Sequence, residues 1–251
     1  MTAPTRVRPT PILATLAIVL AACSTSDVDG PGTTSREIEF ASTDGVTLAG
    51  RLFGPEEANA GVVLAHMFPA DQTSWFPFAD RLAGEGYRVL TFDFRGFCPG
   101  GDAGCSEGEK RVPDMWRDVL GAMQALRDEG VSRIALVGAS MGGTASLVAA
   151  STEGEDVEAI VTLSAPIQFE GLEAGPDEVS QLTAAKLFIA GHADVPAAEA
   201  VDVLYAEALQ PKRPLILTTE DHGTDILAGN QSGIATTEIL NWLDRYLPAS
   251  L

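Results

Sequence analysis

The residues best suited to chemistry are a serine and its flanking glycines, in the Gly-x-Ser-x-Gly string at residues 138–142. The string directly follows the apolar run 134–137, which predicts a strand, and precedes the small residues 144–150, which predict a helix. A sharp strand-to-helix turn exposes a serine hydroxyl at the edge of a sheet, and the helix N-terminus directs N–H groups at a developing oxyanion. A second such string surrounds Ser106, but it lies in a polar loop and follows no strand directly. Ser140 is therefore the candidate nucleophile.

A serine hydroxyl needs a base to take its proton, and the chain contains three histidines, His66, His192 and His222. Each follows an apolar run that predicts a strand, and parallel strands end at one edge of a sheet, so all three could approach Ser140. With an acid at Asp194, the next histidine along the chain is His222, which gives the order Ser, Asp, His of one known triad. We expect His222 to be the base, His66 to have a structural role, and His192 to be exposed or at the rim of a pocket.

The acid is less narrowly defined than the base. Asp194 follows the apolar run 187–190, but it also directly precedes the predicted helix 196–204, whose N-terminus it could cap instead. Asp221 and Asp225 lie beside the candidate base and compete for the same role. The chain order favours Asp194.

The elements that must position these residues follow an alternating pattern. Period-2 spacing between Ile38 and Leu52, on both sides of the turn Thr43-Asp44-Gly45, predicts an antiparallel hairpin. Six continuous apolar runs predict strands covered on both faces, as in a parallel sheet: 62–65, 89–92, 134–137, 160–163, 187–190 and 215–218. Helical patterns fill the gaps, with apolar stripes at Met115–Leu126 and Ile239–Leu247. The fold class is therefore α/β, a doubly wound sheet of about eight mostly parallel strands flanked by helices.

From about Arg36 to Leu247 the sequence resembles the α/β-hydrolase family, through the serine turn, the Gly-x-x-Asp loop that ends at Asp194, and the late pair His222-Gly223. The resemblance implies that Ser140, Asp194 and His222 are nucleophile, acid and base. The stretch 165–185 is too short to form a cap domain. The chain in this respect resembles the capless esterases and dienelactone hydrolases of the family, although dienelactone hydrolases usually carry a cysteine where Ser140 stands.

The resemblance also implies an oxyanion hole. Residues 64–68, Leu-Ala-His-Met-Phe, look like the family's His-Gly oxyanion segment, except that Met67 stands where glycine is usual. The implied donors are the N–H of Phe68, with that of Met67 as the alternative, and the N–H of Met141.

The N-terminus predicts export and a lipid anchor. Residues 1–22 have a short basic region followed by an apolar run too short to span a bilayer, which is typical of a signal peptide. The end of this segment, Leu-Ala-Ala-Cys, resembles the bacterial lipoprotein cleavage box, in which Cys23 receives fatty-acyl chains such as palmitate. Residues 23–35 are then a lipidated tether, and residues 36–251 are the hydrolase domain. The expected location is the bacterial cell envelope, on the extracytoplasmic side of a membrane.

Export changes the interpretation of the other two cysteines. Residues 93–97, Asp-Phe-Arg-Gly-Phe, resemble the family's Asp-x-Arg-Gly loop, here widened by a segment that contains Cys98 and Cys105. Outside the cytosol these two cysteines predict a local disulfide, and the absence of a nearby histidine in the sequence argues against zinc. Ser106 is then a loop serine. We expect no metal and no cofactor.

The net charge of the chain limits the kinds of molecule that it is expected to bind. The formal net charge is -19, which would repel nucleic acids and anionic lipid headgroups, so nucleic-acid binding is not expected. The site predicts a serine hydrolase that cleaves small-molecule or acyl esters through an acyl-enzyme, while the anchor on Cys23 supplies contact with the lipid bilayer. Two alternatives remain: a peptidase or thioesterase that uses the same triad, and a catalytically inactive hydrolase-fold binding lipoprotein.

Overall fold

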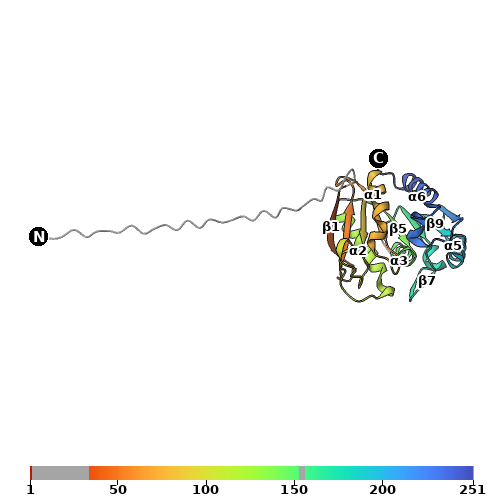
Figure 1. Cartoon of the computed structure of the whole chain (residues 1–251), viewed down its shortest axis with the longest axis horizontal. Helices are drawn as coiled ribbons and strands as arrows, with labels where there is room; N and C mark the ends of the chain where they lie inside the picture. The colour runs from red at the N-terminus through yellow and green to blue at the C-terminus, as the bar shows by residue number, and fades with distance from the viewer. Residues whose placement is uncertain (2–33, 153–155, 251) are drawn as a thin grey trace.

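The computed structural model describes residues 1, 34–152 and 156–250 of the 251-residue chain (Figure 1). The predicted signal segment beyond Met1, the lipidation candidate Cys23 and most of the predicted tether therefore lie outside the described residues. Within the described residues, no helix is long and apolar enough to cross a membrane.

A single eight-stranded sheet forms the centre of the domain, in the order β1-β2-β4-β3-β5-β6-β9-β10 (Figure 1). Strands β1 and β2 form the predicted antiparallel hairpin, β2 is also antiparallel to β4, and all later neighbours pair in parallel. The prediction of about eight mostly parallel strands is confirmed. The strands are β1 (Ser35–Ala41), β2 (Thr47–Phe53), β3 (Ala60–Ala65), β4 (Arg88–Phe92), β5 (Arg133–Ala139), β6 (Ala159–Leu163), β9 (Ala185–Gly191) and β10 (Lys212–Leu217).

Helices cover both faces of this sheet, which explains why the strand sequences are continuously apolar. Within β3, Val63 belongs to one hydrophobic core cluster, whereas Val62 and Leu64 belong to the other. The first cluster lies under α2 (Trp116–Asp128), α3 (Met141–Ala150) and α5 (Val195–Glu207). The second lies under α1 (Phe76–Gly84) and α6 (Ser232–Tyr246). Alternate side chains of one strand thus fill two separate cores.

The stretch between β6 and β9 is more ordered than the predicted loop, but it contains no cap domain. It forms a short hairpin, β7 (Gln168–Phe169) with β8 (Leu172–Glu173), and a one-turn helix, α4 (Pro176–Val179). In Figure 1 the hairpin projects from the end of the domain near α3 and α5. Short 3-10 helices complete the chain: η1 (Gln72–Trp75), η2 (Gly101–Ala103), η3 (Val112–Asp114) and η4 (Gly223–Leu227).

Candidate active site

Ser140 occupies the tight turn between β5 and α3. Its φ of 47° and ψ of -120° lie outside the regions that non-glycine residues prefer, which is the strained geometry expected of a serine in such a turn, and the residue is 8% exposed. The flanking glycines are required by space, because a Cβ on Gly138 would overlap the Gly142 carbonyl and one on Gly142 would overlap the Ala65 carbonyl. Any side chain at these positions would push α3 away from the ends of β3 and β5.

The first turn of α3 leaves amide groups available beside this serine. Helix α3 begins at Met141, and the first N–H groups of a helix have no acceptor within it. The amides of Gly143 and Thr144 return to the Ser140 carbonyl, at 2.9 and 3.1 Å, whereas the Met141 amide makes no such bond among the described residues. The Met141 N–H is therefore free to donate a hydrogen bond to an oxyanion.

His222 and Asp194 lie together, as their order in the sequence predicts. The Nδ1 of His222 lies 2.6 Å from Oδ2 of Asp194. Although Asp194 directly precedes α5, its side chain makes no capping hydrogen bond, so its carboxylate is available for the imidazole. A Cβ on Gly223 would lie 3.4 Å from the Ala139 Cβ, which places the histidine turn against the residue before Ser140.

The two competing acids are directed elsewhere. Oδ2 of Asp221 accepts a hydrogen bond from the Thr219 hydroxyl at 2.6 Å, and Asp225 is exposed in η4. Among the described residues, Asp194 is the one of the three whose carboxylate contacts the His222 ring. His192 is exposed and lines a separate hollow of about 470 Å³ formed with residues 218–221.

His66 is fully buried at the end of β3, where its ring holds the oxyanion segment. Its Nε2 accepts the Phe94 N–H at 3.1 Å, so the proton lies on Nδ1, which donates to the Met67 carbonyl at 2.9 Å. Burial lowers the pKa of His66 to about 4, so the ring is neutral at physiological pH. This is a structural role, in which one ring joins the oxyanion segment to the loop after β4.

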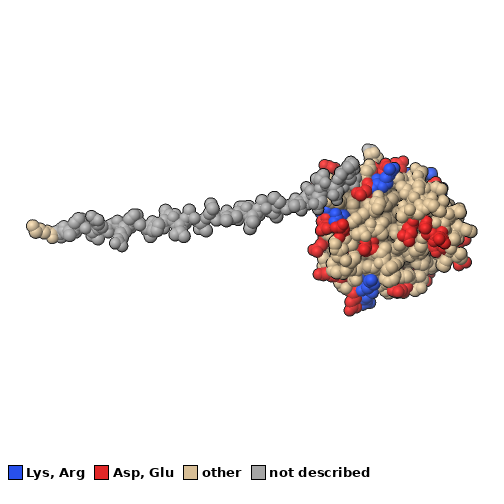
Figure 2. All heavy atoms as spheres, in the orientation of Figure 1, with Lys and Arg blue, Asp and Glu red and all other residues tan. Residues whose placement is uncertain are grey.

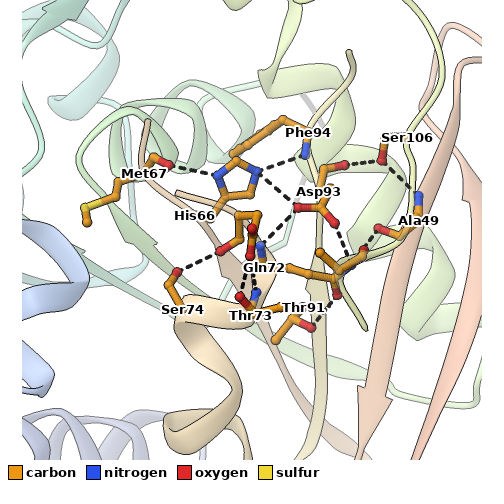
Figure 3. A network of polar contacts seen from close by, with 12 residues as sticks. Ala49, His66, Met67, Gln72, Thr73, Ser74, Thr91, Asp93, Phe94 and Ser106 are labelled. Carbon is orange, nitrogen blue, oxygen red and sulfur yellow. Dashed lines mark hydrogen bonds and ion pairs between the residues drawn. The ribbon is translucent and has the colours of Figure 1, made fainter. Parts of the chain in front are cut away.

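A buried carboxyl lies beside this ring (Figure 3). Oδ1 of Asp93 is 3.9 Å from Nε2 of His66 and accepts the Gln72 N–H at 3.0 Å, while its Oδ2 accepts the Gln72 side-chain amide at 2.7 Å. The Gln72 amide also donates to the Ala103 carbonyl, and its Oε1 accepts the Thr91 hydroxyl at 2.9 Å. Burial raises the pKa of Asp93 to about 7 despite these donors.

The segment after His66 carries the remaining oxyanion candidates. Among the described residues, the N–H groups of Met67 and Phe68 make no intramolecular hydrogen bond, so both remain candidate donors. The Met67 side chain lies against Gly223, since a Cβ there would contact its sulfur at 2.5 Å. Met67, at the position where glycine is usual, thus fills the space between the oxyanion segment and the histidine turn.

The second Gly-x-Ser-x-Gly string is structural. Ser106 is buried, and its hydroxyl donates to the Asp93 carbonyl at 2.6 Å while accepting the Ala49 N–H at 2.9 Å. The predicted disulfide between Cys98 and Cys105 is present and closes the loop just before this serine. Both hydrogen-bonding functions of Ser106 are therefore used by the fold.

Sequence reasoning missed the ion pairs that anchor the same loop. Arg95 is buried and contacts the carboxylates of Asp118, at 2.7 Å, and Asp44, at 2.8 Å. The Arg95 guanidinium lowers the pKa of Asp44 to about 2. An aspartate at position 118, inside the apolar stripe of α2, was the available signal, because a buried charge needs a partner.

Within residues 34–152 and 156–250, no cluster of three or more histidine, cysteine or acidic side chains could hold a metal ion. The described site contains a serine in a strained turn, an imidazole in contact with a carboxylate, and backbone N–H groups without an intramolecular acceptor.

Comparisons with known proteins agree with this architecture. A family profile of the α/β hydrolase fold matches residues 62–243. A Bacillus subtilis protein described as an AB hydrolase superfamily protein is 28% identical over 213 residues, which cover 81% of this chain and 71% of that protein. Among solved structures, an esterase from Pyrococcus furiosus is similar at a TM-score of 0.70 and 19% identity, covering 86% of this chain and 92% of that one. A dienelactone hydrolase from Anabaena variabilis is similar at a TM-score of 0.66 and 18% identity, covering 86% and 99%.

Proposed function

Because this chain belongs to the α/β-hydrolase family, we propose that it is a serine hydrolase that cleaves carboxylic esters through an acyl-enzyme intermediate. The observation that carries the proposal is the 2.6 Å contact between His222 Nδ1 and Asp194 Oδ2, on a turn packed against the strained Ser140 elbow. The proposed nucleophile, acid and base follow three different strands, β5, β9 and β10, and parallel strands end at one edge of a sheet.

The proposed reaction has two halves. His222 Nε2 takes the Ser140 proton while Oγ attacks the ester carbonyl, and the oxyanion forms beside the Met141 N–H and the N–H of Phe68 or Met67. The proton then passes from His222 to the departing alcohol, which leaves an acyl group on Ser140. In the second half His222 removes a proton from water, the resulting hydroxide attacks the acyl carbonyl, and Ser140 leaves with its proton restored. Asp194 keeps Nδ1 protonated and stabilises the imidazolium.

Ester hydrolysis is favoured over peptide or thioester cleavage by the similarity to solved esterases. A Pyrococcus furiosus esterase and one from Thermogutta terrifontis both share the fold across more than four-fifths of this chain. The stretch between β6 and β9 holds a hairpin with two residues in each strand and a short helix, and it contains no cap domain.

The two serine strings provide a matched test of this assignment. Ser140→Ala should reduce hydrolysis of nitrophenyl esters by about 10⁴- to 10⁶-fold, whereas Ser106→Ala should retain most turnover once its folding has been verified by circular dichroism. Labelling by a fluorophosphonate probe separates the enzyme from an inactive binding protein, because only an activated serine is phosphonylated. Equal losses in the two variants, or an unlabelled folded wild type, would refute the proposal.

We also propose that the domain is a lipoprotein of the bacterial cell envelope, anchored through Cys23. The support is the sequence itself, in which a basic region, a short apolar run and small residues precede this cysteine. With its strongly acidic composition, the domain is poorly suited to bind anionic headgroups, so the anchor would provide the membrane affinity.

A further inference from the structure

Three aromatic rings from separate segments meet beside the oxyanion segment. The Phe68 ring lies 6.2 Å from that of Phe97, in the loop after β4, and 6.1 Å from that of Phe169, on the β7 strand of the short hairpin. The Phe97 ring also contacts His66, at a centroid distance of 4.6 Å. The Phe68 ring remains 43% exposed, so this group presents an apolar surface next to the proposed oxyanion donors.

A lysine is held over this aromatic surface. The Nζ of Lys110 lies 3.7 Å from the centroid of Phe97 and 5.2 Å from that of Phe68. Each contact is a cation–π interaction, in which the negative face of the ring attracts the ammonium group. The backbone of Lys110 also packs closely against Gly96, because a Cβ on Gly96 would overlap the backbone nitrogen of Lys110. The ammonium group is thus directed towards the rings by its surroundings.

The charge of Lys110 is not neutralised by an ion pair among the described residues. The other two lysines of the chain, Lys186 and Lys212, each donate to two backbone carbonyls. Lys110 differs from both, since within the part of the chain that the structure describes its ammonium group contacts ring faces and no carbonyl or carboxylate. In a chain with 35 acidic and 16 basic residues, an ammonium without a carboxylate partner stands out.

The wider surface provides little other positive charge on the side shown in Figure 2, where acidic side chains are scattered and basic ones form isolated patches. Such a surface repels anionic substrates in general, so recognition of an anion needs a local cation near the reacting bond. Lys110 supplies such a cation beside the apolar ring of Phe68.

We propose that Lys110, supported on Phe68 and Phe97, binds a carboxylate on the substrate, so that the substrates are esters that carry a negative charge as well as an apolar chain. The apolar chain lies on the Phe68 ring, and the carboxylate contacts the Lys110 ammonium. This inference rests on the proposed ester hydrolysis and specifies its substrate class. Lys110 acts in binding, so its removal should raise KM for charged esters more than KM for neutral esters.

The test compares matched esters with and without the charge. Monoethyl glutarate carries a carboxylate on its acyl chain, and ethyl pentanoate is its neutral counterpart; the pentanoyl ester of glycolate places the charge on the alcohol side. For at least one charged ester, Lys110→Gln should reduce the ratio of its kcat/KM to that of ethyl pentanoate by about three- to tenfold, through KM. Lys110→Arg should retain the ratio, and added salt should lower it in the wild type more than in Lys110→Gln.

Lys212→Gln is the matched control, because it removes the same charge at the first residue of β10, the edge strand next to β9. An unchanged ratio for both charged esters in Lys110→Gln, or an equal change in Lys212→Gln, would overturn the inference. Failure of the proposed function is a separate result: it would appear as a loss of Ser140-dependent hydrolysis of ethyl pentanoate itself.

Discussion

The buried pair formed by His66 and Asp93 should contribute two opposing pH dependences to the stability of the protein, which largely cancel in the wild type. The pKa of His66 is lowered by burial from 6.5 to about 4, and the pKa of Asp93 is raised by burial from 3.8 to about 7. Between pH 4 and 6.5 the unfolded chain has a charged histidine and a charged aspartate at these positions, whereas the folded chain has both groups neutral. The two states therefore bind the same number of protons at this pair.

Each group alone would make stability depend strongly on pH. The unfolded chain binds a proton at His66 that the folded chain does not, so this group destabilises the fold as pH falls, by about 3 kcal/mol between pH 6.5 and 4. Asp93 acts in the opposite direction, because the folded chain keeps a proton that the unfolded chain loses. Its contribution decreases as pH rises, by about 4 kcal/mol between pH 3.8 and 7. In the wild type the two slopes largely cancel.

Single substitutions should separate these slopes. Asp93→Asn leaves the histidine alone, so the free energy of unfolding should fall relative to wild type by about 2–3 kcal/mol from pH 6.5 to 4.5. In His66→Gln the new side-chain oxygen can still accept the Phe94 N–H, and Asp93 is the one group of the pair that still titrates. The free energy of unfolding of this variant should therefore rise relative to wild type, by a similar amount, from pH 6.5 to 4.5.

Urea unfolding at several pH values, followed by fluorescence, measures both slopes. Contributions from other carboxylates cancel when each variant is compared with wild type, and a loss of stability that is constant with pH does not affect the slope. His66→Asn, which keeps a donor near the Nδ1 position, provides a second profile without the histidine. Parallel profiles for the Asp93 and His66 variants would refute the conclusion that both groups are neutral in the fold.

Three further outcomes are expected. Asp194→Asn should reduce kcat/KM for nitrophenyl esters by about 10³- to 10⁴-fold, whereas Asp221→Asn should retain most activity, because its carboxylate is bound by a threonine hydroxyl; the reverse result would reassign the acid. Reduction of the Cys98–Cys105 disulfide should lower the free energy of unfolding by at most about 2–3 kcal/mol, so a thermal melt with reductant that shows global unfolding at 25 °C would contradict it. Metabolic labelling with a fatty-acid analogue should mark the wild type but not Cys23→Ser, and equal labelling of the two would exclude this cysteine as the anchor.

The sequence was sufficient to predict the sheet because its strands have a distinctive composition. Runs such as 62–65 and 134–137 are apolar at every position, and in the structure their alternate side chains fill two different cores. Element ends were less predictable: β10 begins at Lys212, three residues before its apolar run, because backbone pairing with β9 extends through polar side chains of an edge strand. Likewise α3 begins directly at Met141 and not at residue 144, since the serine turn leads into the helix without a linker.

The order of the candidate triad along the chain favoured Asp194 as the acid, but it could not exclude Asp221 and Asp225, which lie beside His222 in the sequence. All three lie near carboxyl ends of strands, where several side chains can reach one point. The choice depends on side-chain directions, and these are set by contacts such as the Thr219 hydroxyl, which holds Asp221 away from the histidine. A pattern of residue types does not contain that information.

The support of the oxyanion segment depends on strand register, which explains why it could not be predicted. Ala65 pairs with Phe92 in the parallel register of β3 and β4, so the next residues, His66 and Asp93, leave the sheet at the same level. A shift of one residue would send one of these side chains to the opposite face of the sheet and separate the pair. Two residues far apart in sequence therefore become partners only through that register, and Gln72 joins them from a third segment. Because the same register places the Phe94 N–H on the ring that holds the Met67 carbonyl, the geometry of the proposed oxyanion hole is fixed by the pairing of β3 with β4.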